Sequence, residues 1–215
     1  VERINIYGNS ITNEDVIRSE LLLDEGDPFN NLKLDQSIAK LRSKDIFATV
    51  KKEVKVGSEP DLQIIDITIE EKPTGEISAG AGVGSDGGTV QVGIKENNWL
   101  GQGKSIGLEI QADEESLIGD FRYTDPNYNF LGNSLYYNLS SEKNDKPDQG
   151  YENSIVSAGA GLSFEQYKDV KVLLSLQASY DDLSTLDSAS DSLKKQAGEF
   201  SEIAAVSYTH LRAHE

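Results

Sequence analysis

The chain has 215 residues, no cysteine, no methionine and a formal net charge of −17. Without cysteine it has no disulfide framework and no thiolate metal site, and its acidic surface repels phosphates, so nucleic acid is not an expected partner. No run of about 18 apolar residues is present, which excludes a transmembrane helix. A membrane β-barrel stays open as an alternative, because each of its strands needs only about 10 alternating residues.

Residues 1–72 read as a small α+β domain with the order β-α-α-β-β. The segment opens and closes with strand-like alternation, and two stretches with apolar residues at helical spacing lie between. We expect the first helix to run from a cap at Thr12 or Asn13 to Gly26, and the second to begin at Asn30 or the asparagine after it. No signal peptide is visible, and Val1 starts directly in a strand-like run, so we expect an internal fragment.

A charged strand within this domain is expected at an edge of its sheet. Charges on an edge strand resist random aggregation, whereas an exposed edge can accept an extended strand from another protein. We therefore predict that a client strand adds to this edge. The residues assigned to it are Lys51, Lys52, Glu53, Val54 and Lys55.

After Pro73 the helical spacing disappears, and successive segments alternate between apolar residues and small or polar ones. In residues 75–84 one face is apolar, and the other carries little besides Ser78 and glycines. A soluble sandwich would place polar bulk on its wet face, whereas a membrane barrel has lipid outside and water inside. Seven strand candidates and a weaker eighth therefore predict part of an antiparallel transmembrane β-barrel over residues 73–206.

The connections between these strands are of two alternating kinds. The odd connections are polar and acidic and lengthen along the chain, whereas the even ones carry aromatic residues, which favour a membrane interface. We expect the even connections on the side of the first domain and the odd ones at the outer surface. The predicted interface aromatics are Trp99, Tyr128, Phe130 and Tyr167.

No group of side chains indicates covalent catalysis, a cofactor or a metal. Three glycines in residues 80–84 have the spacing of a phosphate loop, but a strand follows them instead of a helix. The acidic stretch 181–191 lacks the ordered ligands of a calcium loop. His210 and His214 are spaced like a helical metal pair but have no third ligand. We therefore expect a protein that is not an enzyme, with no cofactor or metal site.

Several stretches resemble known families. Those that resemble a POTRA domain are residues 6–9, 23–27, 41–47 and 69–71. Two downstream motifs are more specific, and with the POTRA-like domain they closely resemble the BamA family of outer-membrane protein assembly factors over residues 1–206. These motifs are Asn97-Asn98-Trp99-Leu100-Gly101-Gln102-Gly103 and Thr124-Asp125-Pro126-Asn127-Tyr128. Residues 207–215 depart from the family pattern and resemble a spurious tail on a truncated gene model.

The resemblance implies a bacterial outer-membrane protein with its POTRA domain in the periplasm, which folds and inserts other β-barrel proteins. Its partners would be unfolded outer-membrane proteins, accessory lipoproteins and the lipid bilayer. An acidic first helix would dock a lipoprotein, with Glu20 as the expected contact, although a solvated helix face explains the charges equally well. The chain would hold one POTRA domain and about half of the barrel strands.

The first barrel strand would form one lip of a lateral seam. Its glycines weaken strand pairing and so favour opening, or they only relieve crowding at the seam. The residues assigned to the seam are Ile77, Ser78, Ala79, Gly80, Ala81, Gly82, Val83 and Gly84.

Three other interpretations of the sequence stay open. A POTRA-containing two-partner secretion pore and a translocation-and-assembly relative share the pattern of a POTRA domain followed by barrel strands. A soluble β-sandwich with an α/β appendage is the third.

Overall fold

The computed structural model describes residues 1–84, 87–167 and 170–211 and divides the chain into two compact units. The first unit comprises residues 1–75 together with residues 97–104, and the second comprises residues 76–96 and the chain from residue 105 onward. Residues 97–104 were predicted as a connection between barrel strands, and the structure places this turn in the first unit.

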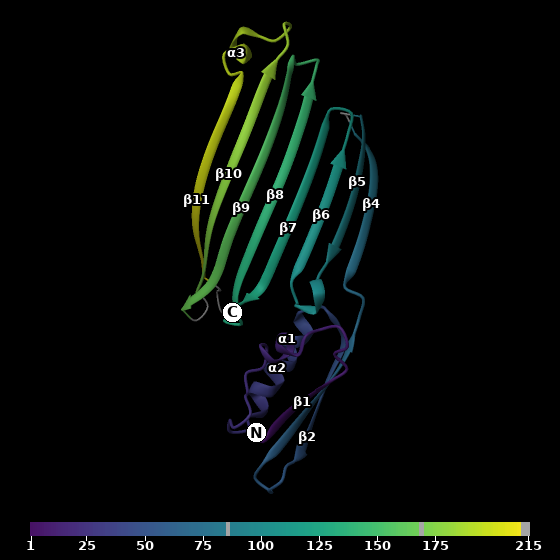
Figure 1. Ribbon diagram of the computed structural model, residues 1–215, viewed down its shortest axis with the longest axis vertical. Coiled ribbons are helices and arrows are strands. Elements are labelled where there is room, and N and C mark those ends of the chain that lie inside the picture. Colours follow the sequence, from purple (N-terminus) through teal and green to yellow (C-terminus); the bar gives the residue numbers. More distant parts are fainter. Residues whose placement is uncertain (85–86, 168–169, 212–215) are drawn as a thin grey trace. The chain divides into compact units, whose positions relative to one another are not determined.

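The first unit contains a three-stranded sheet in the order β1-β3-β2, with two helices between β1 and β2 in the chain (Figure 1). Strand β1 runs parallel to β3, and β2 runs antiparallel to β3. The predicted order β-α-α-β-β is confirmed. The elements are β1 (Arg3–Tyr7), α1 (Glu14–Arg18), α2 (Asn31–Ser43), β2 (Phe47–Val56) and β3 (Gln63–Glu71).

Helix α2 packs its apolar stripe into the core of this unit. Leu34, Ile38 and Leu41 recur at the spacing that places them on one helix face, and all three are buried. They belong to one cluster with the inward residues of β3, including Ile65 and Ile67. The helix begins where the sequence predicts, because the Asn30 side chain accepts a hydrogen bond from the backbone N–H of Lys33 at 3.2 Å.

Helix α1 is shorter than predicted and ends at Arg18 instead of near Gly26. The Ser19 hydroxyl donates back to the carbonyl of Val16 at 3.0 Å, a bond that competes with helix continuation. The chain then bends, so Leu23 reaches the core from outside the helix. Asn13 occupies the N-cap position without a side-chain capping bond.

The second unit is a single sheet of eight strands that lie in chain order from β4 to β11 (Figure 1). The predicted antiparallel barrel strands are confirmed, and the weak eighth candidate is a full strand. Among the described residues β4 and β11 are edge strands, so the sheet is not closed. The strands are β4 (Gly75–Gly84), β5 (Gly87–Glu96), β6 (Ser105–Ala112), β7 (Ser116–Tyr128), β8 (Asn133–Lys146), β9 (Tyr151–Tyr167), β10 (Val170–Thr185) and β11 (Gly198–Leu211).

Several strands are longer than predicted, because polar residues continue the ladders. The stretch 142–153 was expected to be a loop, but β8 and β9 extend through most of it, joined by cross-strand contacts such as Asn144 Nδ2 to Asn153 Oδ1 at 3.1 Å. The motif 124–128 lies inside β7, where the pairing with β8 shifts register, and is not a connection.

Two short helical segments were not predicted after residue 73. They are the 3₁₀ turn η1 (Trp99–Gly101) and the one-turn helix α3 (Asp191–Lys194). Neither these nor any other helix within the described ranges is long and apolar enough to span a bilayer.

The last part of β11 belongs to the ladder with β10. Residues 207–211 pair with residues 170–174, and the ladder is continuous through Leu211. Whether residues 207–215 are foreign to the chain stays a prediction. The predicted first connection at Ser85 and Asp86, and His214 in the tail, lie outside the described residues.

Candidate functional site

Strand β4, the predicted seam strand, lies at an edge of the eight-stranded sheet, and every residue in it is exposed. A Cβ atom at Gly80, Gly82 or Gly84 would meet no other atom within 4 Å. No neighbour in the described chain therefore requires glycine at these positions. Whether these glycines weaken strand pairing or relieve crowding at a seam stays a prediction.

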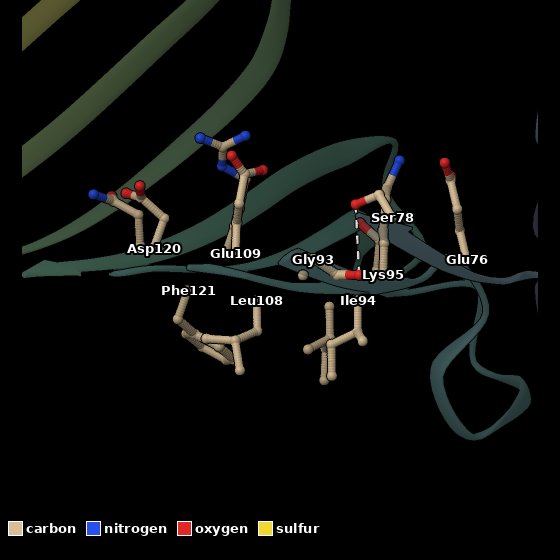
Figure 2. A pocket seen from close by; sticks show the side chains of 14 residues that line it. Glu76, Ser78, Gly93, Ile94, Lys95, Leu108, Glu109, Asp120 and Phe121 are labelled. Carbon is tan, nitrogen blue, oxygen red and sulfur yellow. Dashed lines mark hydrogen bonds between the residues drawn. The ribbon is translucent and has the colours of Figure 1, made fainter. Parts of the chain in front are cut away.

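The sheet next to β4 has two chemically different faces (Figure 2). Glu76, Ser78, Glu109 and Asp120 project from one face. The apolar side chains project from the other face, and those labelled are Ile94, Leu108 and Phe121. The polar side chains border a hollow of about 470 Å³. On this polar face the Gln91 amide donates to Glu109 Oε1 at 2.5 Å. The alternation of polar and apolar residues in the sequence thus becomes a polar face and an apolar face.

The connections alternate between the two ends of this antiparallel sheet (Figure 1). The loops after β6, β8 and β10 lie at one end and contact one another. The Asp145 N–H donates to the carbonyl of Glu115 at 2.7 Å, and Lys146 forms an ion pair with the Glu115 carboxylate. The Leu186 N–H donates to the carbonyl of Gly150 at 2.8 Å. These three acidic connections are therefore joined to one another by hydrogen bonds.

The aromatic residues predicted at a membrane interface belong to the even connections or to the strand ends beside them. Trp99, Tyr128, Phe130 and Tyr167 are all exposed. Trp99 lies in the turn 97–104, which belongs to the first unit. Contact of these side chains with a bilayer stays a prediction.

The two edges of the small sheet differ in how they are covered. At β1 the Ile4 N–H donates to Glu25 Oε1 at 2.9 Å, and the Ile4 carbonyl accepts from Arg18 Nη2 at 3.0 Å. At β2 the carbonyl of Val50 accepts from Arg42 at 2.8 Å. Beyond that point, no strand or loop in the described ranges pairs with the outer edge of β2.

Two of the three lysines of the predicted client edge, Lys52 and Lys55, form ion pairs with acidic neighbours. Lys52 Nζ lies 2.5 Å from Asp35 Oδ1 on α2. Lys55 Nζ lies 2.7 Å from Asp66 Oδ2 and 3.3 Å from Glu53 Oε2. Hydrogen bonds from Lys55 and Asn5 lower the pKa of Asp66 below its ordinary value. These pairs orient the charged side chains and leave the outer backbone edge of β2 open.

Glu20 lies past the end of α1 and not in mid-helix as predicted. Its carboxylate lies 2.8 Å from Lys44 Nζ, and the two side chains are only 15% and 14% exposed. The ion pair joins the end of α1 to the end of α2. A contact between Glu20 and a lipoprotein stays a prediction, and the contact would have to form beside this pair.

Sequence reasoning missed Glu71, the last residue of β3. Its carboxylate accepts hydrogen bonds from the backbone N–H groups of Ser10, Ile11 and Thr12 at 3.0, 2.9 and 2.6 Å, and from the Ser10 hydroxyl at 2.8 Å. Burial of this carboxylate raises its pKa, but the hydrogen bonds outweigh burial and lower the pKa to about 2. Glu71 is therefore ionised at neutral pH and fixes the loop at residues 10–12.

The turn 97–104 packs on the same loop. Asn98 is only 6% exposed, and its Nδ2 donates to Thr12 Oγ1 at 2.8 Å while its Oδ1 accepts from the Gly103 N–H at 2.7 Å. The Asn13 N–H donates to the carbonyl of Gly101 at 2.8 Å. Gly101 has a φ of +70°, and a Cβ there would lie 2.1 Å from the Ile11 carbonyl oxygen. The sequence signal for this contact is the Asn-Asn-Trp-Leu-Gly motif, because the motif contains Asn98.

The described residues contain no group of three His, Cys, Asp or Glu side chains placed to hold a metal ion. The chemistry that this arrangement offers is instead backbone pairing at strand edges and polar contact on one face of a membrane-type sheet.

Comparison with known proteins agrees with this architecture. Residues 1–72 match the POTRA family model, described as a surface antigen variable number repeat, and residues 98–212 match the Omp85 superfamily domain. The outer membrane protein assembly factor BamA of Neisseria meningitidis serogroup B is 29% identical over 170 residues, which are 78% of this chain and 20% of that protein. BamA of Neorickettsia risticii is 27% identical over 215 residues, which are 97% of this chain and 28% of that protein. The chain thus spans little more than a quarter, at most, of these relatives.

Solved structures show the same fold. BamA from Haemophilus ducreyi lacking POTRA domains 1–3 has a TM-score of 0.76 at 24% identity, with 97% of this chain and 42% of that chain covered. CdiB from Acinetobacter baumannii has a TM-score of 0.54 at 13% identity, with 100% and 44% covered. The predicted resemblance to the assembly-factor family is confirmed. With a POTRA module followed by an Omp85 domain that covers more than half of its residues, the chain belongs to the Omp85 superfamily.

Proposed function

We propose that this chain is part of a bacterial outer-membrane assembly factor that folds and inserts other β-barrel proteins without covalent chemistry. Its clients are unfolded outer-membrane proteins, its surroundings are the lipid bilayer and the periplasm, and accessory lipoproteins are its partners. Membership of the Omp85 superfamily and the BamA-type relatives support this proposal. The observation that carries it is the open outer edge of β2, whereas side chains bind the backbone of β1 at the opposite edge of the same sheet.

The physical task of such a protein is to keep strand edges paired. An unpaired strand edge cannot enter lipid, because its N–H and C=O groups have no water to bind there. A protein edge that pairs with the client strand removes this cost. In the proposal β2 pairs with a client strand in the periplasm, and β4 is one lip of a lateral seam through which client strands enter the membrane.

The difference in backbone coverage between β1 and β2 favours β2 as the edge that binds the client strand. A strand can add to β2 beyond Val50 without displacing any bond within the described chain, whereas addition at β1 must break the bonds that Glu25 and Arg18 make to Ile4. Added strands gain affinity mainly from main-chain hydrogen bonds, so the blocked edge cannot compete.

Photo-cross-linking tests this assignment. A photoreactive side chain at Val54 on β2 is expected to capture an unfolded client. The same side chain at Arg3 on β1 is not, because side chains already bind the neighbouring outward N–H and carbonyl of Ile4. Both positions are exposed, so accessibility is matched. The complete protein carrying either substitution is irradiated with a client present, and adducts are measured on gels. Equal capture at both positions, or capture at Arg3 alone, contradicts the assignment.

The orientation of the sheet makes a second prediction. A cysteine at Asp148, in the set of acidic connections, is expected to react with a membrane-impermeant thiol reagent on intact cells. A cysteine at Asn127, near the opposite end of the sheet, is expected to stay unlabelled until the cells are lysed. These 215 residues contain no cysteine, and any cysteine elsewhere in the complete protein is replaced, so labelling reports one position at a time. Labelling at Asn127 alone contradicts the orientation.

The secretion pore and the translocation-and-assembly relative are alternative proposals. The CdiB structures, with TM-scores of 0.54 and 0.56, support the pore less than the BamA structure, at 0.76, supports the assembly factor. The docking of a lipoprotein beside Glu20 remains part of the proposal and is independent of this choice.

A further inference from the structure

The loop at residues 10–13 is held by two separate sets of contacts within the first unit. The Glu71 carboxylate binds its N–H groups, and the turn 97–104 binds the hydroxyl of Thr12 and the N–H of Asn13. The loop has no regular secondary structure. Its shape therefore depends on these side-chain contacts and on the Asn9 amide, which donates to the Thr12 carbonyl at 3.2 Å.

The contacts on the turn side need the loop in one shape. The Ile11 carbonyl lies so close to Gly101 that a single Cβ would overlap it. The Asn98 amide and the Thr12 hydroxyl are both buried, so each would lose a hydrogen bond without replacement from water if the loop moved. Gly103 has a φ of +65°, and a Cβ there would lie 2.8 Å from Val16 Cγ1 on α1. A loop displaced by a small distance would lose these contacts together.

We infer that Glu71 is a positioning residue. It holds the loop 10–13 in the shape in which Thr12 and Asn13 form their hydrogen bonds with the turn 97–104. Glu71 makes none of the contacts to the turn that are described above, and it acts through the N–H groups of Ile11 and Thr12. The carboxylate can orient several donors at once because an ionised carboxylate has two oxygens with about four acceptor sites. Hydrogen bonds to an ionised group are also stronger than neutral ones.

The contact between the loop and the turn affects the chain segments that lead into β4, β5 and β6. Glu71 is followed in the chain by β4, and the turn 97–104 joins β5 to β6. The contacts between the loop 10–13 and the turn 97–104 therefore fix, within the first unit, the chain that leads into three neighbouring strands, including the proposed seam strand. Under the proposed function, loss of these contacts slows client insertion. The contacts themselves lie in the first unit and do not depend on that function.

Amide hydrogen exchange in the complete protein tests the inference. In Glu71→Gln, which keeps the side-chain size but removes the charge, exchange is expected to rise about tenfold or more at Ile11 and Thr12 and also at Gly103 and Asn13, because charged hydrogen bonds are lost. Amides of β3 between Ile65 and Ile67 are expected to keep their wild-type rates. Glu70→Gln is the matched control, since Glu70 is the preceding residue, is exposed, and bonds Thr49 Oγ1 at 3.1 Å.

Two results would overturn the inference. In the first, Glu71→Gln loosens Ile11 and Thr12 while Gly103 keeps its protection, so the loop does not transmit the effect. In the second, exchange rises equally across β3, so Glu71 only stabilises the module as a whole. If Glu71→Gln fails to fold, Thr12→Val replaces it: exchange at Gly103 is expected to rise while Ile11 stays protected, and an unchanged Gly103 overturns the inference. Because exchange is measured without a client, this experiment still tests the role of Glu71 if the protein proves to have another function.

Discussion

A disulfide between β4 and the last strand of the complete barrel is expected to abolish client insertion while the barrel remains folded. In the proposed mechanism this edge must separate before a client strand can pair with β4, and a covalent bond prevents separation. Gly82 is the suitable position on β4, because a side chain there meets no other atom within 4 Å. Insertion of a client into liposomes, measured with and without a reducing agent, is expected to be lost when the bond forms and restored when it is reduced.

The control is a disulfide between two strands that are already paired inside the sheet. Gln91 on β5 lies opposite Gln111 on β6 in the ladder, so cysteines at these positions lock a pair that has no reason to open. This lock is expected to leave insertion unchanged. Full insertion by the protein locked at Gly82 would remove β4 from the mechanism, and loss of insertion in both locked proteins would show only that cross-links impair the barrel.

Acidification is expected to loosen the loop 10–13 through Glu71. Its pKa in the folded protein is about 2, against an ordinary value of 4.5. A lowered folded-state pKa contributes stability above the ordinary value, and that contribution is lost as the pH falls from about 4.5 towards 2. Because solvent screens this partly exposed carboxylate, the loss in the free energy of opening the loop is expected to be on the order of 1 to 2 kcal/mol, less than the full shift would give. Amide exchange at Ile11 and Thr12, corrected for its intrinsic dependence on pH, measures this loss.

The variant Glu71→Gln is expected to flatten the dependence on pH, because it has no carboxylate to protonate at this position. Amides of β3 are expected to keep their wild-type dependence on pH in this variant, since Asp66, whose pKa is also lowered, lies in that strand and is unchanged. Glu70→Gln should retain the wild-type profile at Ile11 and Thr12. A profile in Glu71→Gln as steep as in the wild type would show that the hydrogen bonds to Glu71 do not stabilise the loop.

The sequence by itself was sufficient for features that depend on neighbouring residues. Alternation of apolar and polar residues predicts the strands and assigns each side chain to a face, because successive residues in a strand point to opposite faces. Leu34, Ile38 and Leu41 predict α2, and Asn30 predicts its start, since the capping bond reaches only three residues along the chain. The odd and even connections could likewise be sorted, because their end of the sheet follows from antiparallel order.

Only the tertiary structure decided the features that depend on residues far apart in the chain. The bonds from Thr12 to Glu71 and from Asn98 to Thr12 join residues separated by 59 and 86 positions. Such contacts leave no periodic pattern in the sequence, so the roles of Glu71 and Asn98 could not be predicted. The end of α1 and the open edge of β2 also depend on distant residues. Helix α1 ends at a bend that brings Leu23 to the core. The edge of β2 beyond Val50 is open because the side chains of Arg18 and Glu25 cover β1 instead.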